Sequence, residues 1–307
     1  MSRNFITREA CPACGARGGE TLFECGFCEP PIREYLVAFY APQGGVEFDW
    51  LAGESFALVE CAECGLIYQK HIGTDALLQR LYEHWIDPAK VLALIDGRQD
   101  ARYFMGLAKQ VGNVIAHFGV APCELACLDF GMGWGHWCRI ARGFGCEVAG
   151  VELSEARIAH ARAAGIEVLA PGDLARRQFD FINTEQVFEH LAEPFETLLL
   201  LKKSLKPRGL LRLSVPDGWG VKRRIARGDW LAPKGSANSL NAVAPLEHIN
   251  CFHYRNLVRF AARAGFVERA VPDVYSMDAL DAARDLLKPW VHRFRGRRNT
   301  ALYFSYE

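Results

Sequence analysis

Two short cysteine repeats near the start of the chain have the spacing of metal ligands. Residues 11–15 (CPACG) and 61–65 (CAECG) both read C-x-x-C-G, a spacing that lets two thiolates converge on one ion. Two such repeats supply the four sulfur ligands of a closed tetrahedral site, which is typical of structural Zn²⁺. The spacing therefore predicts a four-cysteine site formed by Cys11, Cys14, Cys61 and Cys64.

A third pair, Cys25 and Cys28, lacks the glycine that follows the other two pairs. One interpretation is that these two cysteines are bystanders, and the alternative is a redox-active disulfide between them. The chain has 11 cysteines. An odd number with paired C-x-x-C spacing favours metal binding over a disulfide framework.

A glycine-rich turn follows an apolar segment in the middle of the chain. Residues 128–135 (LDFGMGWG) place Asp129 before Gly131, Gly133 and Gly135, and Glu152 follows 21 residues after Gly131. Such a turn lets a ligand approach the backbone closely, and an acid at that distance can accept both hydroxyls of a ribose. The third glycine comes one residue too early for the dinucleotide fingerprint. The turn therefore favours a nucleoside cofactor without a pyrophosphate over NAD, and so disfavours an NAD oxidoreductase.

A histidine beside a glutamate, Glu247-His248, follows a long segment rich in glycine and serine. Histidine is the side chain best suited to accept a proton near neutral pH, so we predict a catalytic pair in which His248 is the base and Glu247 orients its ring. The alternative is a structural histidine that bridges the loop. His190, beside Glu189, is better explained by capping or packing.

Alternating strands and helices must position these residues. The pattern predicts strands at 125–130, 147–152, 166–169, 179–183, 210–215, 267–271 and 301–306. It predicts helices at 74–85, 101–118, 134–144, 154–164, 194–205, 254–264 and 277–294. Short apolar strands separated by helices are typical of a parallel sheet covered on both faces.

These segments, in this order, resemble class I S-adenosylmethionine (SAM) methyltransferases. Besides the glycine turn, residues 179–191 (FDFINTEQVFEHL) resemble the family's fourth-strand region, and residues 205–211 (LKPRGLL) resemble its turn into the fifth strand. The resemblance implies an α/β fold with a doubly wound, mostly parallel, seven-stranded Rossmann-like sheet, and SAM as cofactor. It implies these cofactor-binding residues: Asp129, Gly131, Gly133, Gly135, Glu152, Asp173 and Gln186.

The N-terminal region resembles the small zinc-binding domain of sugar C-methyltransferases from antibiotic biosynthesis. That resemblance favours the two C-x-x-C-G repeats as the zinc ligands, because the family has no ligand where Cys25 and Cys28 stand. Residues 245–252 (PLEHINCF) resemble the family's segment with Glu247 and His248, although Pro245 stands where the family has a tyrosine. Those enzymes also have a large C-terminal domain, which we do not expect in these 307 residues, and this argues against a nucleotide-sugar substrate.

Composition and charge limit the remaining choices. Lys+Arg and Asp+Glu both number 36, and a net charge of 0 argues against nucleic acid as a partner. The longest aliphatic run, 91–95, is too short to cross a bilayer, which argues against a membrane protein. Position 12 is a proline where a signal peptide would be apolar, so we expect a cytoplasmic protein.

We therefore expect three regions: a zinc-binding domain at 1–72, linking helices at 73–120, and a SAM-binding domain at 121–307 with an insertion or lid at 217–244. The predicted function is SAM-dependent methylation of a small molecule, such as a sugar or an intermediate of secondary metabolism. The rival from another class is a non-catalytic zinc-binding protein with a SAM fold that acts as an interaction partner. The intact Asp129, glycine turn and Glu152 favour the enzyme.

Overall fold

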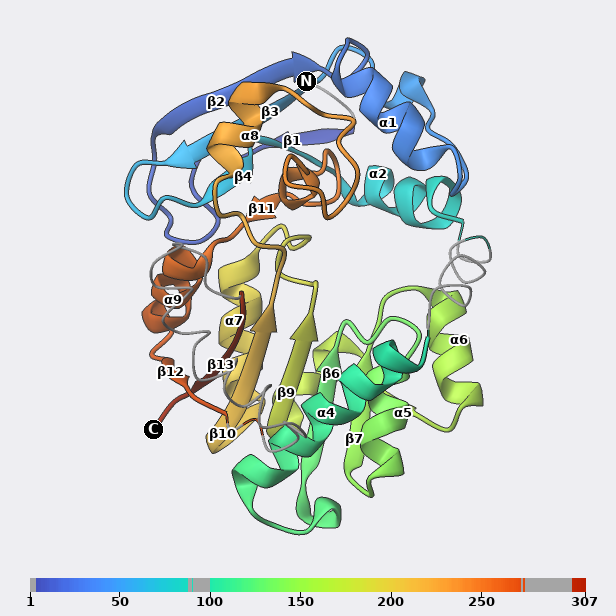
Figure 1. The fold of residues 1–307 in the computed structure, drawn as a ribbon, viewed down its shortest axis with the longest axis vertical. Helices are drawn as coiled ribbons and strands as arrows, with labels where there is room; N and C mark the ends of the chain where they lie inside the picture. The colour runs from blue at the N-terminus through green and yellow to red at the C-terminus, as the bar shows by residue number, and fades with distance from the viewer. Residues whose placement is uncertain (1–3, 88–89, 91–99, 272, 274–299) are drawn as a thin grey trace. The chain divides into compact units, whose positions relative to one another are not determined.

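A computed structural model describes residues 4–87, 90, 100–271, 273 and 300–307 (Figure 1). The helix expected at 277–294 lies outside the described residues. Two compact units make up the chain. The first is drawn from Met1–Arg98, Phe188–Phe195 and Pro216–Asn256, and the second from Gln99–Val187, Glu196–Val215 and Leu257–Glu307. Within the described residues, no helix is both long enough and apolar enough to span a membrane.

A seven-stranded sheet forms the centre of the second unit and confirms the predicted fold class (Figure 1). Its order is β12 (Val267–Arg269), β13 (Ala301–Ser305), β10 (Leu205–Ser214), β9 (Phe179–Glu185), β6 (Ala126–Phe130), β7 (Glu147–Val151) and β8 (Glu167–Val168). The five strands from β10 to β8 run parallel, whereas β13 is antiparallel to both β10 and β12. All five parallel strands therefore end at one edge of the sheet, where open α/β folds bind their ligands.

Amphipathic helices cover this sheet. The helices are α4 (Ala101–Phe118), α5 (His136–Gly143), α6 (Glu155–Ala163), α7 (Pro194–Lys203) and α9 (Tyr254–Arg263), with short turns η3 (Pro122–Glu124) and η4 (Pro171–Arg176). Helix α4 begins where the side chain of Asp100 accepts a hydrogen bond from the backbone N–H of Tyr103, and it ends at Gly119 in the left-handed conformation. Buried Val111 and Val114 of α4 pack with Trp137 of α5 in one hydrophobic cluster over the sheet.

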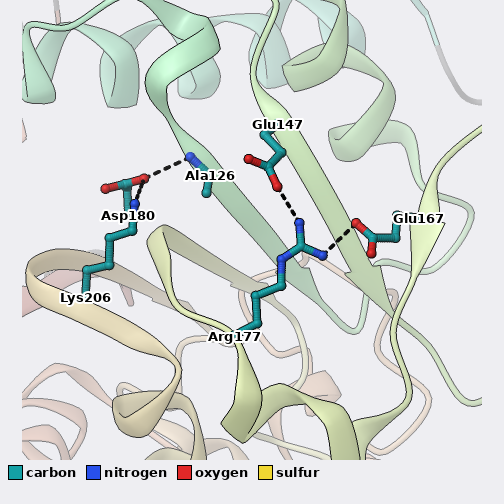
Figure 2. A network of polar contacts seen from close by, with 6 residues as sticks. All are labelled: Ala126, Glu147, Glu167, Arg177, Asp180 and Lys206. Carbon is teal, nitrogen blue, oxygen red and sulfur yellow. Dashed lines mark hydrogen bonds and ion pairs between the residues drawn. The ribbon is translucent and has the colours of Figure 1, made fainter.

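Ion pairs hold the opposite, amino edge of the sheet together (Figure 2). Arg177 donates to Glu167 at 2.7 Å and also pairs with Glu147, so the starts of β7 and β8 share one cation. Asp180 accepts from Lys206 at 2.8 Å and from the backbone N–H of Ala126 at 2.9 Å, which joins β6, β9 and the start of β10. These partly exposed contacts fix strand register away from the predicted cofactor edge.

The first unit is built on antiparallel strands. A four-stranded sheet has the order β11 (Asn250–Cys251), β4 (Ile67–Gln69), β3 (Ser55–Cys61) and β2 (Gly19–Gly26), and β1 (Phe5–Thr7) pairs separately with β5 (His71–Gly73). Its helical segments are α1 (Ile32–Tyr40), η1 (Phe48–Trp50), α2 (Asp75–Arg80), η2 (Leu81–Trp85), α8 (Val221–Arg227) and η5 (Asn241–Val243). Strand β11 comes from far along the chain, so the Glu247-His248 segment reaches this unit through it.

The segment at 217–244, expected to be an insertion or lid, contributes to the core of the first unit. It contains α8 and η5, and its hydrophobic side chains join one buried cluster with α1, β3 and α2. Trp230, for example, is 3 % exposed and its ring centroid lies 4.7 Å from that of Phe23. The many glycines hid this role, because the apolar residues that pack here are too irregularly spaced to show a helix or strand period.

Candidate functional site

The glycine turn of the second unit leaves one position open. Gly131, Gly133 and Gly135 all adopt positive φ angles between the end of β6 and the start of α5. A Cβ at Gly131 would lie 2.5 Å from Cγ2 of Val187, and one at Gly135 would lie 2.7 Å from Cδ1 of Ile166. A Cβ at Gly133 would meet nothing within 4 Å. The outer glycines therefore allow close packing, whereas the middle one faces space from which a ligand can approach.

Glu152 ties the end of β7 to this turn. Its Oε2 accepts a 3.0 Å hydrogen bond from the N–H of Gly133, and its Oε1 accepts from the N–H groups of Leu153 and Ser154 at 2.8 and 3.0 Å. The sequence predicted a carboxylate that binds a ribose, and the structure places that carboxylate against the turn. Its role toward a cofactor stays a prediction.

Asp129 is almost fully covered, with 3 % of its surface exposed. Its Oδ1 accepts a 2.8 Å hydrogen bond from Nδ2 of Asn183, and its Oδ2 lies 3.7 Å from the thiol of Cys138. Burial raises the pKa of Asp129 to about 7, although these two hydrogen bonds act in the opposite direction. This acid is therefore buried near the end of β6, just before the turn in sequence, and holds a proton far more readily than an exposed aspartate.

The other two predicted cofactor residues also follow strands at the carboxyl edge. Asp173 lies in η4 after β8, is largely exposed, and pairs with Arg176 at 3.3 Å. Gln186 directly follows β9 with a φ of 54°, and its N–H donates to the carbonyl of Ser214 at 2.8 Å. A positive φ at a non-glycine residue is strained and is frequent at functional sites.

Sequence reasoning missed four polar residues on β9 and β10, beside Asp129. They are Asn183, Glu185, Arg212 and Ser214. The signal was present in the sequence, because these polar side chains occupy strand positions that a parallel sheet usually fills with apolar residues.

The first unit brings the four predicted zinc ligands together. The sulfur atoms of Cys11, Cys14, Cys61 and Cys64 all lie within 4.8 Å of one another. The Cys11–Cys64 and Cys14–Cys61 distances are 3.6 and 3.5 Å. Sulfur atoms on one tetrahedral zinc would be about 3.8 Å apart, given Zn–S bonds of about 2.3 Å. The residues therefore fit Zn²⁺.

Both cysteine repeats fold into the same turn. The N–H of Gly15 donates to the carbonyl of Cys11 at 2.8 Å, and the N–H of Gly65 donates to that of Cys61 at 3.0 Å. Both glycines have positive φ angles, which explains their place after each pair. Cys25 and Cys28 lie outside this cluster and have free thiols.

A second cluster in the first unit joins the predicted catalytic pair to Glu189 and His190. Ligand atoms of Glu189, His190 and His248 lie within 4.8 Å of one another, and the two imidazole centroids are 4.9 Å apart. Nδ1 of His190 lies 2.9 Å from the carbonyl oxygen of Glu247. Two segments more than 50 residues apart in the sequence therefore meet here, and His190 belongs to the group.

His248 is held in one tautomer. Its Nδ1 contacts the carbonyl oxygen of Asn241, which can only accept, so Nδ1 carries the proton and Nε2 keeps the lone pair. Burial, then the neighbouring charge of His190, lowers the pKa of His248 to about 3. The imidazole is therefore neutral at physiological pH. We expected Glu247 to orient the ring of His248. In the structure the ring instead contacts the carbonyl of Asn241.

Residues beside the cysteine repeats hold this cluster in place. The buried amide of Gln69, on the strand after Cys64, donates to the carbonyls of Ala244 and His248 at 2.9 and 3.1 Å. Arg8, just before Cys11, donates to the side chain of Asn250 at 2.9 Å and to the carbonyl of Ala192 at 2.9 Å. The backbone around the histidines is thus held by residues that lie close in sequence to the two cysteine repeats.

A family model described as a methyltransferase domain matches residues 100–271, more than half of the 307 residues. The chain belongs to this family, and it is a class I SAM-dependent methyltransferase. No curated protein matches it.

Solved methyltransferases resemble this chain only distantly. The plantazolicin methyltransferase BpumL, solved with S-adenosylhomocysteine, is 14 % identical over 75 % of this chain and 92 % of its own, with a TM-score of 0.47. A protein described as a sarcosine dimethylglycine methyltransferase from Galdieria sulphuraria is 16 % identical over 65 % and 85 %, with a TM-score of 0.43. CalS10, an amino pentose methyltransferase from Micromonospora echinaspora, is 24 % identical over 41 % and 55 %, with a TM-score of 0.35.

Proposed function

We propose that this enzyme methylates a small molecule, such as a sugar or an intermediate of secondary metabolism, at a position that must lose a proton. SAM, when bound, supplies a methyl group on a sulfonium and so carries the reactivity itself. The chain then has to bind the cofactor, orient the acceptor and receive the proton. We assign cofactor binding to Asp129, the glycine turn, Glu152, Asp173 and Gln186.

The observation that supports the acceptor proposal is the cluster of Glu189, His190, Glu247 and His248 in the first unit. Glu189 and His248 are buried, whereas His190 and Glu247 are half-buried. Carboxylates and imidazoles removed from water are unfavourable unless they are paired, so this grouping supports a role beyond packing. In this proposal the neutral His248 accepts the proton at Nε2, because Nδ1 already donates to Asn241. His190 and Glu247 position the two backbone segments that carry Glu189 and His248, through the contact between the His190 ring and the carbonyl of Glu247.

We also propose that the four-cysteine cluster binds one structural Zn²⁺. Four sulfur ligands leave no open coordination position, so the ion would hold the first unit together and take no part in the transfer. Hydrogen bonding from the thiol of Cys11 lowers the pKa of Cys64, which favours the thiolate form that a metal ligand needs. A site of reduced thiols is also consistent with a cytoplasmic location.

The test is transfer of a labelled methyl group from SAM to a panel of small acceptors. The panel should contain sugars, nucleotide sugars and phenolic or amino acids, with a protein and an RNA as comparisons. We expect incorporation into a small molecule that depends on His248, and loss of incorporation in His248→Gln. Methylation of only the protein or the RNA would contradict the proposed acceptor class.

A further inference from the structure

A stripe of polar side chains crosses the middle of the sheet in the second unit. Asp129 on β6 is paired with Asn183 on β9, and Asn183 is paired with Arg212 on β10, with Glu185 and Ser214 two residues further along their strands. Four of the five are buried: Asp129, Asn183, Arg212 and Ser214 are at most 5 % exposed. The side chain of Glu185 is 45 % exposed and forms the open end of the stripe.

Hydrogen bonds connect all five residues. Asn183 donates to Asp129 at 2.8 Å, and Nη1 of Arg212 donates to the side-chain oxygen of Asn183 at 2.9 Å. The same guanidinium forms a close ion pair with Oε2 of Glu185, and Ser214 donates to Oε1 at 2.9 Å. Glu185 is therefore fixed on both carboxylate oxygens.

The stripe carries at most one more negative charge than positive charges. Two carboxylates and one guanidinium sum to a charge of −1 when both acids are ionised, and Arg212 is already paired with Glu185. The groups that face Asp129 are Asn183 and Glu185 of β9, Arg212 of β10, Cys138 of α5 and Tyr103 of α4. Among these only Arg212 is cationic. Because Asp129 holds its proton readily, the charge that a ligand can reach is the carboxylate of Glu185 at the exposed end of the stripe.

The strand order indicates which part of the cofactor would lie there. In the strand order β9–β6–β7–β8, the glycine turn follows β6. Glu152 and Asp173 follow β7 and β8 on one side of it, and Glu185 ends β9 on the other side. Val187, just after Glu185, packs against Gly131 of the turn. If the ribose and adenine extend toward Glu152 and Asp173, the methionine part extends toward Glu185. That part carries an ammonium, a sulfonium and a carboxylate, so it offers a cation to the exposed carboxylate of Glu185.

We propose that Glu185, fixed by Arg212 and Ser214, is a further cofactor-binding residue whose carboxylate binds the ammonium group of the methionine part of SAM. Arg212 and Asn183 are positioning residues that act through Glu185 and Asp129. This inference rests on the SAM-dependent class of the enzyme and is independent of the acceptor and of zinc.

Three ligands test it by calorimetry with the full chain: SAM, S-adenosylhomocysteine, and 5′-deoxy-5′-methylthioadenosine. The second lacks the sulfonium charge, and the third lacks the whole amino-acid end. Glu185→Gln keeps the shape and removes the charge, so we expect Kd for the first two ligands to rise about 10- to 100-fold. Kd for methylthioadenosine should stay within about twofold of the wild-type value.

The matched control is Glu147→Gln. Glu147 also pairs with an arginine, Arg177, but at the amino edge of the sheet (Figure 2). The Glu147→Gln substitution should leave the Kd values of all three ligands unchanged. Wild-type SAM affinity in Glu185→Gln would overturn the proposal, as would an equal loss for all three ligands, which would indicate a structural role. A loss confined to SAM would place Glu185 at the sulfonium and overturn the ammonium assignment.

Discussion

The phenol of Tyr40 donates a 2.7 Å hydrogen bond to Oε1 of Glu247, across 207 positions of sequence. Tyr40 ends helix α1 and is completely buried. Burial, with the charge of Glu247, keeps the pKa of Tyr40 well above its usual value, so the phenol remains a donor at any physiological pH. One residue of the predicted catalytic pair is thus anchored to the core of the first unit.

Removing this hydroxyl should destabilise the protein through Glu247. We expect Tyr40→Phe to lower the free energy of unfolding by about 1.5–3 kcal/mol, the range for a hydrogen bond to a charged group. Tyr35→Phe is the matched control, because Tyr35 is also buried on α1 and senses the charge of Glu247. Denaturant unfolding of Tyr40→Phe, Glu247→Gln and the double variant measures the coupling directly. A coupling energy near zero would show that the contact contributes nothing.

The cysteine cluster predicts one equivalent of zinc per chain. Cys14→Ser or Cys61→Ser should abolish zinc binding and unfold the first unit locally, because structural zinc contributes folding energy directly. Elemental analysis and circular dichroism provide the two measurements. The Cys25→Ser, Cys28→Ser double variant is the control and should keep its zinc. Zinc that survives Cys14→Ser, or that disappears with the Cys25 and Cys28 pair, would contradict the ligand assignment.

The glycine turn predicts different consequences at two neighbouring glycines. Gly133→Val should strongly weaken SAM binding, because its side chain would occupy the open space at the turn, and a left-handed backbone adds about 1–2 kcal/mol of strain. Gly131→Ala should mainly reduce stability, because its Cβ would overlap Val187. Calorimetric titration with SAM and thermal unfolding separate the two effects. Undiminished SAM affinity in Gly133→Val would mean that the ligand approaches elsewhere.

The parts of the fold that short sequence patterns specify, namely strands and tight turns, could be predicted from the sequence. The apolar strands, the glycine turn after β6 and the two C-x-x-C-G turns each carry their own signal, and the structure confirms the sheet and the cysteine cluster. The predicted helix at 74–85 is shorter in regular form, since α2 ends at Arg80 and a wider turn follows. The domain boundaries and the roles of the cofactor residues stay predictions.

Long-range relationships were out of reach, because no periodicity records which distant segments meet. Nothing near Tyr40 in the sequence points to Glu247, and nothing near Gln69 points to the backbone of His248. The compact units are also interleaved along the chain, so the segments at 188–195 and 216–256 fold with the N-terminal residues. The low pKa of His248 follows from burial, which the histidine-glutamate motif alone does not reveal.

That pKa fixes how activity should depend on pH if His248 is the base. A base must be unprotonated, so the rate rises as pH passes upward through its pKa in the enzyme. With that pKa lowered to about 3, His248 is unprotonated at every pH above about 4, but it is also a weaker base than an ordinary imidazole. We therefore expect His248→Gln to cut turnover by about 10²-fold, the lower end of the usual contribution of a general base, throughout pH 5–8 and with little change in the shape of the profile.

His190→Gln is the matched comparison, because His190 lies in the same cluster with 26 % of its side chain exposed. The turnover of the wild type could instead decrease as the pH falls below about 6.5, the ordinary pKa of a histidine. If His190→Gln removes that decrease, His190 is the base. SAM affinity should be unchanged in both variants, because the cofactor residues we assign lie in the second unit. Wild-type turnover in His248→Gln would exclude His248 as the base. Before an acceptor is known, nitrogen-15 imidazole spectra should already show the Nδ1–H tautomer of His248 that its contact with Asn241 requires.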